Sequence, residues 1–586
     1  MLSKLHRYPT PVITSERGTI IGLCALALAL TALFLGGHTL VLTGDEPRYL
    51  MYAASILKYG RYVMTLPEWQ PLYLRVTHSV ASGLPVGGDG NVLMNGVYLP
   101  TLLAPIANLF SLPGLRGATL LAGFAGLFYL FRLCRRFSTP GTALFVTAIA
   151  GFTIPLLPYL HLFYMETFLF ALICCGWDRL QEKDRGWGGD LITAFVLLAV
   201  PFVQMRGSVV AASLYSLLCW QLYSRGLVKR AALFVILAAA ALGLLITLNL
   251  SIYGAITGPV NTARPPAPSE WLSVITMQLF NVRHGLLAYA PIWLLGFAGL
   301  WVGVVRGPAI PRQALVLAIV AVVTSVGINP GECWPARFWV LSVPMLTIGF
   351  CAWWVAARPA LRLVAVFLLG FTLVNTCIYV ISPNAFLENR QTTTTYQMLF
   401  DKLRTFNFGL MLPVEVNDAP NSAAARDLAI GSGLFIFLMA LAAQQRRLAY
   451  AVPAILLIVA TLDLSRVRVI HPSEYSVTID HSRIRIEPKI SVAVAYIQFG
   501  HNTQTWFAPP EWQRFTVAVS GTGGQPTSTT LSANQVIAAS CSKSITSIEI
   551  QSPGGFDIGS EANYRFQAYE SKSLLRRWLT ELRRAC

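Results

Sequence analysis

Apolar residues occur along the chain in long blocks that are separated by shorter polar stretches. A helix needs roughly 20 apolar residues to cross the hydrocarbon core of a bilayer. The blocks have about that length, so the pattern predicts a polytopic α-helical membrane protein with about thirteen transmembrane helices. The predicted spans lie near residues 19–41, 115–133, 140–158, 163–177, 190–205, 208–224, 230–251, 286–305, 313–328, 338–356, 361–381, 427–444 and 448–465.

Composition excludes a water-soluble globular protein. Of the 586 residues, 55% are hydrophobic and only 12% are charged, and the mean hydropathy is +0.57. A soluble domain carries about 25% charged residues. The net charge of +17 would suit a nucleic-acid-binding protein, but the positive residues lie mostly between the apolar blocks. We therefore predict a lipid bilayer as the partner of this surface and no nucleic acid.

The positions of the basic residues predict the orientation in the membrane. Every second connection is short and basic, for example around Arg135 and around Lys229, and such connections face the cytoplasm. The connections 42–114, 252–285 and 382–426 then lie on the outer side. The first apolar block lacks a small-residue cleavage site, so we expect a retained helix and a cytoplasmic N-terminus.

The pattern changes after residue 465. Short segments alternate apolar and polar residues and are punctuated by Gly, Pro, Ser and Thr, which is typical of β-strands. We predict a transmembrane domain over residues 1–465 and an extracytoplasmic β-rich domain over 466–586, with an amphipathic helix near Ser571 to Arg584. Cys541 and Cys586 both lie in this tail, and whether they pair stays open.

Two adjacent carboxylates, Asp45 and Glu46, follow the first apolar block directly. One interpretation is structural: Thr43 and Glu46 have the spacing of a capping box, and Pro47 favours a first helical turn. The other is catalytic, with the two carboxylates standing at a helix start on the outer membrane surface. The two interpretations are compatible, because a fixed helix start also fixes the direction of a carboxylate.

Other ionisable residues lie on the same predicted side. Glu166 stands at the outer start of the fourth span, where an ionisable group is costly unless it faces a cavity or a partner. A water-exposed position at the interface is the alternative for Glu166. Cations near outer span ends suit a phosphate group, although anchoring to lipid headgroups would explain any one of them. The main candidates are Arg206, Arg337, Arg283 and His284, and Arg48, Arg264 and Arg390 are further ones.

Four stretches in order resemble the GT-C superfamily of membrane glycosyltransferases, which includes bacterial protein mannosyltransferases and lipid A aminoarabinose transferases. Gly44 to Leu50 (G-D-E-P-R-Y-L) looks like the first outer loop of that superfamily, and Val97 to Pro105 resembles its second outer-surface helix. Arg283 to Pro291 and Pro335 to Pro344 are similar to the starts of later spans. The likeness covers about residues 20 to 380.

The resemblance implies roles for individual residues. Asp45 would be the general base, Glu46 or Glu166 would orient the acceptor or help to hold a metal, and an arginine such as Arg206 or Arg337 would stabilise the departing phosphate. At the position of Glu166 the superfamily usually has Asp. Many members also have Lys or His where this chain has Leu99, so other residues must hold the phosphate here.

The sequence thus predicts a glycosyltransferase of the bacterial inner membrane. It would move a hexose or a pentose, with inversion, from a polyprenyl-phosphate donor to an extracytoplasmic glycan, lipid or protein. A divalent cation as cofactor stays open, with Asp45 and Glu166 as its ligands if it is present. A transporter or flippase of lipid-linked sugars, or a polysaccharide polymerase or ligase, is the alternative function. The sugar and the acceptor are not defined by the sequence.

Overall fold

The computed structural model describes the chain from residue 16 to 381 with gaps at 37–41, 43, 79, 82, 86–92, 94, 183, 260–270, 282–284, 307 and 326–335. Further along it describes residues 419–445, 448–453, Lys489 and ten strands between 467 and 571. The chain divides into two compact units. The first comprises residues 1–268, 290–387 and 439–445, and the second comprises 269–289, 388–438 and 446–586.

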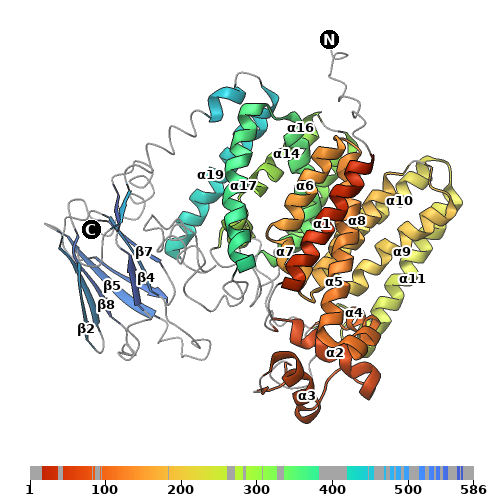
Figure 1. Ribbon diagram of the computed structural model, residues 1–586, viewed down its shortest axis with the longest axis horizontal. Helices are drawn as coiled ribbons and strands as arrows, with labels where there is room; N and C mark the ends of the chain where they lie inside the picture. Colours follow the sequence, from red (N-terminus) through yellow and green to blue (C-terminus); the bar gives the residue numbers. More distant parts are fainter. Residues whose placement is uncertain are drawn as a thin grey trace. The chain divides into compact units, whose positions relative to one another are not determined.

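The described part of the first unit is helical (Figure 1). Its helices pack side by side, and short helices α2 to α4 and the 3₁₀ turns η1 and η3 connect or precede the longer ones. In chain order the elements are α1 (Glu16–Gly36), α2 (Glu46–Tyr59), α3 (Leu66–Thr77), α4 (Tyr98–Leu102), α5 (Ala104–Arg135), α6 (Pro140–Phe152), α7 (Leu156–His161), α8 (Met165–Leu180), α9 (Trp187–Val203), η1 (Met205–Gly207), α10 (Ser208–Ser224), α11 (Val228–Tyr253), α14 (Trp293–Arg306), α15 (Ala309–Ser325), η3 (Arg337–Ser342), α16 (Val343–Ala356) and α17 (Pro359–Ile381).

Five helical stretches are long and apolar enough to cross a membrane: 18–35, 104–135, 228–253, 337–356 and 359–380. Five shorter apolar helices lie at 140–152, 187–203, 293–305, 309–325 and 430–444. The prediction of a polytopic helical membrane protein is confirmed at this level. The number thirteen stays a prediction, and most of the last predicted span, 448–465, lies outside the described residues.

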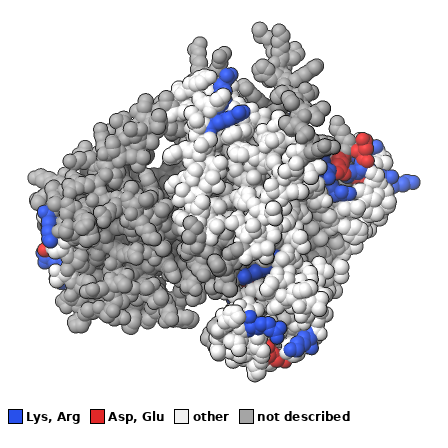
Figure 2. Space-filling model, in the orientation of Figure 1, with Lys and Arg blue, Asp and Glu red and all other residues white. Residues whose placement is uncertain are grey.

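Charged side chains gather at the two ends of the helical unit, and the surface between them is almost free of charge on the face that Figure 2 shows. Helix α8 illustrates the separation. Glu166 lies in its first turn, and Asp178 in its last turns pairs with Arg132 and Arg136 from the end of α5. Glu166 and Asp178 are twelve residues apart, about 18 Å along the helix, so the two charged groups are separated by more than half of a hydrocarbon core.

Helices α14 and α16 approach each other at glycines. A Cβ atom on Gly299 would overlap the backbone carbonyl of Gly349, and one on Gly349 would overlap the carbonyl of Gly296. Small residues at such crossings let two backbones approach closely, which is a common way of packing membrane helices. This contact fixes α16, and with it the turn η3 that precedes α16.

The second unit contains α12 (Trp271–Phe280), α13 (Leu286–Tyr289) and antiparallel sheets. A five-stranded sheet has the order β2-β3-β8-β5-β6, and its register partners Ile486 and Ile548 are both buried. Helix α19 (Ala419–Gln444) contributes residues to both units. The strands are β1 (Val467–Val469), β2 (Tyr475–Asp480), β3 (Arg483–Pro488), β4 (Val494–Phe499), β5 (Arg514–Gly521), β6 (Thr527–Ser532), β7 (Val536–Ser540), β8 (Ile545–Gln551), β9 (Tyr564–Gln567) and β10 (Tyr569–Ser571).

These strands lie in the part of the chain whose alternating pattern predicted them. The domain boundary at 465 and the outer location of the tail stay predictions. The predicted terminal helix, Cys541 and Cys586 lie outside the described residues.

Candidate active site

Asp45 lies at the N-cap of α2 and faces two guanidinium groups. Arg337 Nη2 is 2.6 Å from Asp45 Oδ2, and Arg48 Nη1 is 3.1 Å from Asp45 Oδ1. Arg48 also donates from Nε to the carbonyl of Pro85 at 2.9 Å. The side chain of Asp45 makes no capping bond to its own helix and remains 17% exposed. Its carboxylate is therefore directed to the site and not to the helix start.

Glu166 is fully buried in the first turn of α8 and joins the same cluster. Its Oε1 accepts a hydrogen bond from Arg337 Nε at 2.7 Å and one from Arg206 Nη2 at 3.2 Å. Arg337 thus bridges Asp45 and Glu166. The structure brings together four residues that the sequence singled out, and it buries Glu166 where a water-exposed position was the alternative.

Two short 3₁₀ turns position the arginines. Arg206 lies in η1, between α9 and α10, and Arg337 begins η3 directly after Ala336, whose φ is +58°. A non-glycine residue in this left-handed region is uncommon and is held there by its surroundings. The guanidinium of Arg206 lies 4.5 Å from the ring centroid of Phe338, and that of Arg337 lies 4.7 Å from the ring of Tyr164. Aromatic faces thus support both cations.

The cluster leaves polar atoms without partners among the described residues. They are Arg206 Nε and Nη1, together with Glu166 Oε2. The side chain of Arg206 is only 2% exposed. A buried N–H or carboxylate oxygen that lacks a hydrogen bond is costly and needs a reason. Among the described residues, three guanidinium groups, those of Arg48, Arg206 and Arg337, also face two carboxylates, so one positive charge is uncompensated there. The arrangement suits an anionic ligand that accepts hydrogen bonds.

The charges around Asp45 decide its protonation. Burial alone would raise the pKa of this carboxyl group, but Arg337, Arg48 and a hydrogen bond from Asn95 outweigh that effect, so the pKa of Asp45 lies below its ordinary value. Asp45 is a carboxylate at neutral pH. While Arg337 holds it, however, it is also a weak base.

Glu46 has different partners from those of Asp45. Its side chain is fully buried, and both of its oxygens accept hydrogen bonds from Arg116, at 2.7 Å from Nε and 2.6 Å from Nη2. The backbone N–H of Phe163 donates to Glu46 Oε1 at 2.9 Å. The capping-box interpretation is wrong, because Glu46 is the first residue of α2, whereas a capping box with Thr43 would need it to be the third. Thr43 itself lies outside the described residues.

The sequence reasoning missed Arg116. This residue lies near the start of a predicted span and is 9% exposed. An arginine inside an apolar block is expensive unless it has a partner, and that cost was the signal that could have found it.

Arg283 and His284 lie outside the described residues, as do Arg264 and Arg390, so their roles stay predictions. Within the described residues no group of three or more His, Cys, Asp or Glu side chains is arranged to hold a metal ion. The charges that face Asp45 and Glu166 are guanidinium groups, and both oxygens of Glu46 accept hydrogen bonds from Arg116. The described side chains thus do not fit a cation bound by all three acids, and a cation bound by Asp45 and Glu166 stays a prediction.

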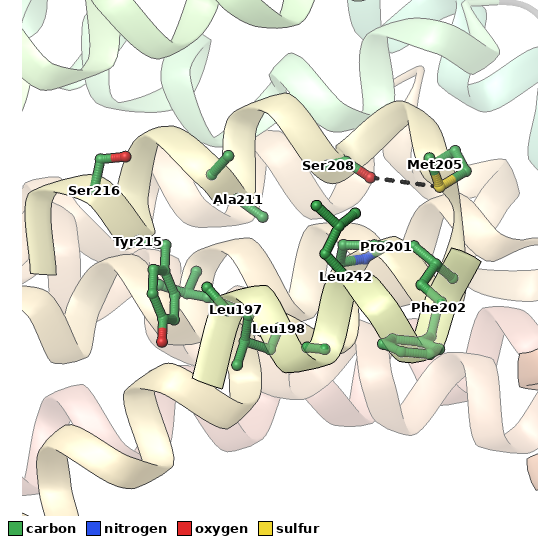
Figure 3. Close-up of a pocket in the computed structure, with 14 residues that line it drawn as sticks. Leu197, Leu198, Pro201, Phe202, Met205, Ser208, Ala211, Tyr215, Ser216 and Leu242 are labelled. Carbon is green, nitrogen blue, oxygen red and sulfur yellow. Dashed lines mark hydrogen bonds between the residues drawn. The ribbon is translucent and has the colours of Figure 1, made fainter. Parts of the chain in front are cut away.

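An apolar groove of about 310 Å³ lies beside η1, between α9, α10 and α11 (Figure 3). Pro201 and Phe202 line it from α9, and Leu242 lines it from α11. Met205 and Ser208, which flank Arg206 and Gly207 in the chain, line one end and contact each other through Ser208 Oγ and Met205 Sδ at 3.9 Å. The groove therefore begins next to the turn that carries Arg206.

Comparisons with known proteins add little to this geometry. No family model and no curated protein matches the chain. Two solved structures are similar to it, both of ArnT from Cupriavidus metallidurans. The apo state has 17% sequence identity over 75% of each chain and a TM-score of 0.41. The state bound to undecaprenyl phosphate has 16% identity over 75% of this chain and 76% of that chain, also with a TM-score of 0.41. A similarity of this size carries no argument about activity.

Proposed function

We propose that the protein is a GT-C-type glycosyltransferase that moves a sugar from a polyprenyl-phosphate donor to an acceptor hydroxyl, with Asp45 as the general base. The observation that carries the proposal is a series of ion pairs that joins Asp45 to Arg337, Arg337 to Glu166 and Glu166 to Arg206. In this series, buried N–H groups of Arg206 lack partners among the described residues. A base beside unsatisfied cations, at one end of membrane-length helices, is what transfer from a lipid phosphate requires.

The donor phosphate would bind to the free nitrogens of Arg206 and draw Arg337 from Asp45. Asp45 is then released from its strongest partner, and its basicity rises when the donor is in place. Asp45 takes the proton of the acceptor hydroxyl, the acceptor oxygen forms a bond to the anomeric carbon, and the bond from that carbon to the phosphate oxygen breaks. The electron pair stays on the polyprenyl phosphate, beside the arginines. A single displacement of this kind inverts the anomeric centre.

The groove beside η1 would take the first isoprene units of the donor. Its lining is apolar, and it starts at Met205 and Ser208, on either side of the arginine that we assign to the phosphate. Its volume of about 310 Å³ lies at the lower end of the usual range for ligand pockets, roughly 300 to 1,000 Å³. A prenyl chain that emerges from it would continue into lipid.

The site lies at the start of α8, and the basic residues Arg132 and Arg136 lie at the end of that helix. By the positive-inside rule, the basic end is cytoplasmic and the site faces outward. Our proposal is therefore an enzyme of a bacterial inner membrane with an extracytoplasmic acceptor and a cytoplasmic N-terminus. The remaining helices up to thirteen and the outer position of the β-rich tail belong to the same proposal.

The test uses the purified full-length protein in liposomes. It would be supplied with radiolabelled sugars on polyprenyl monophosphate or pyrophosphate and with cell-envelope acceptors, and covalent transfer would be measured. We expect transfer from the monophosphate only, and Asp45→Asn should lower its rate by at least about 10²-fold. Arg61→Gln, which breaks an exposed pair with Glu68 at the same end of the molecule, is the matched control and should transfer normally.

Each alternative has its own result in this assay. Donor translocation without covalent transfer would identify a flippase, and transfer from the pyrophosphate alone would identify a polymerase or ligase. Normal turnover by Asp45→Asn would remove Asp45 as the base.

A further inference from the structure

Glu46 connects three parts of the helical unit through one carboxylate. It begins α2, it receives both hydrogen bonds of the Arg116 fork from α5, and it accepts the N–H of Phe163 in the segment that leads into α8. Asp45 is the preceding residue of Glu46, and Glu166 follows Phe163 by three residues. One buried ion pair therefore links the two chain segments that carry the carboxylates bridged by Arg337.

The geometry of the pair suits the orientation of a carboxylate better than the stabilisation of the fold. A buried ion pair loses its hydration, and an apolar pair of similar volume is often as stable or more so. A bidentate arginine, in contrast, fixes both the distance and the plane of its carboxylate. The additional bond to the backbone of Phe163 fixes the same carboxylate from a second side. Glu46 is not open to a substrate, because its side chain is fully buried and both of its oxygens accept charge-assisted hydrogen bonds.

We propose that Glu46 and Arg116 are positioning residues. They hold the carboxylate of Asp45 in the position relative to Arg337 and Glu166 that proton transfer needs. This inference rests on the proposed function. It differs from the role that the sequence assigned to Glu46, since Glu46 would act through Asp45 and not on the acceptor.

Other contacts tie the same segments together, and the test has to separate their effect. Tyr49 of α2 makes edge-to-face contacts with Phe163 and Tyr164, at centroid distances of 5.9 and 6.3 Å. These rings keep α2 near α8 even without the ion pair. We therefore expect variants of the pair to fold, while the carboxylate of Asp45 loses its direction.

The first experiment separates folding from positioning. Arg116→Lys keeps the charge but loses the fork, and the double variant Glu46→Gln/Arg116→Met replaces the ion pair by a neutral one that can still accept the Phe163 N–H. For both we expect a thermal midpoint close to that of the wild type, an unchanged KM for the donor and a kcat lowered by about 10²-fold, the size that small misplacements cause. A wild-type kcat in both variants, or a raised KM with normal kcat, would overturn the proposal.

A matched control is the buried pair of Arg185 and Asp190, whose side chains are both fully buried and which lies beyond the other end of α8. Asp190→Asn removes a charge from a similar environment. We expect its kcat and KM to remain those of the wild type, because this pair does not touch the site.

The second experiment does not depend on transfer. A hydrophobic carbodiimide reacts with protonated carboxyl groups, and mass spectrometry of the Asp45 peptide measures its labelling between about pH 4 and pH 8. Among the described residues, the titratable and charged groups around Asp45 are Arg337, Arg48, Glu166 and Tyr49. We expect Asp45 to resist labelling in the wild type and to be labelled toward the acid end in both pair variants. If the labelling of Asp45 is the same in the wild type and in both pair variants, the positioning role is overturned. If the labelling differs but the wild-type protein transfers no sugar, the proposed function alone is overturned.

Discussion

At the scale of single residues, Arg337 controls the charge of Asp45. The pKa of Asp45 is low because Arg337 and Arg48 outweigh the effect of burial, so the carboxylate persists, and supports folding, down to its lowered pKa and is lost below it. Removing Arg337 leaves burial opposed by Arg48. We predict that Arg337→Gln moves the acid limb of the pH profile of kcat/KM for transfer to higher pH. We also predict that it weakens the use of the donor more than the use of the acceptor.

The pH profile of purified Arg337→Gln, measured beside that of Arg61→Gln, checks this prediction. The Arg61–Glu68 pair is exposed and outside the cluster, so its loss should leave the acid limb in place. An acid limb that is the same in wild type and Arg337→Gln would show that another group sets it.

The sequence predicted the residue types of the site better than their partners. Glu166 was recognised because a carboxylate at the edge of an apolar block is costly without a partner. Glu46 was grouped with Asp45, its neighbour in sequence, yet its partner is Arg116, seventy residues away. A side chain's partner depends on which helices lie together, and periodicity along one helix does not contain that information.

At the scale of elements, the crossing of α14 and α16 depends on glycine. A Cβ on Gly299 would overlap the backbone of α16, and backbone cannot move aside as a side chain can. We predict that Gly299→Ala destabilises the protein by about 1 to 3 kcal/mol, the usual cost of overpacking, measured as a lower thermal midpoint in detergent. Gly370→Ala in α17 is the matched control, because nothing lies within 4 Å of its added Cβ. An equal loss in both variants would show that the crossing is not its cause, since alanine is a better helix former than glycine.

The groove between α9, α10 and α11 makes a second prediction at this scale. Ala241→Phe would fill part of the groove and displace about two methylene groups of the donor, each worth about 0.8 kcal/mol. We expect the KM for a long-chain donor to rise about tenfold with kcat unchanged, and the KM for a donor with a single short prenyl unit to change less.

Leu244→Phe provides the comparison for Ala241→Phe. Leu244 lies on the same helix, is 54% exposed and does not line the groove. If the long-chain KM rose equally in both variants, the groove would not be the site of the prenyl chain.

Hydrophobic periodicity predicted where helices lie but not where they are interrupted. The apolar block at 140–158 is divided in the structure into α6, which ends at Phe152, and α7, which begins at Leu156. The block at 115–133 belongs to the longer α5, which begins at Ala104 and contains a non-helical residue, Ser111. Mean apolarity does not change at such breaks, so a search for apolar runs passes over them.

At the scale of the whole molecule, the helical unit has a direction across the membrane that follows from the charges at its two ends. The carboxylate–arginine site lies at the start of α8, and the ion pairs of Asp178 with Arg132 and Arg136 lie at its end. If the site uses a donor on the outer surface, the two ends must be on opposite sides of the membrane. Gly83 and Gly186 are suitable reporters, because each is exposed and has open space around an added Cβ. Gly83 lies near Pro85, which binds Arg48, and Gly186 precedes α9.

We predict that, in a variant freed of its native cysteines, Gly83→Cys reacts with a membrane-impermeant maleimide in intact cells, whereas Gly186→Cys reacts only after permeabilisation. The reason is the positive-inside rule, since the basic residues gather near Gly186. The transfer activity of each reporter variant shows that its fold is intact. The opposite labelling would place the carboxylate–arginine site in the cytoplasm, where sugar nucleotides are available, and would remove the reason for a lipid-phosphate donor.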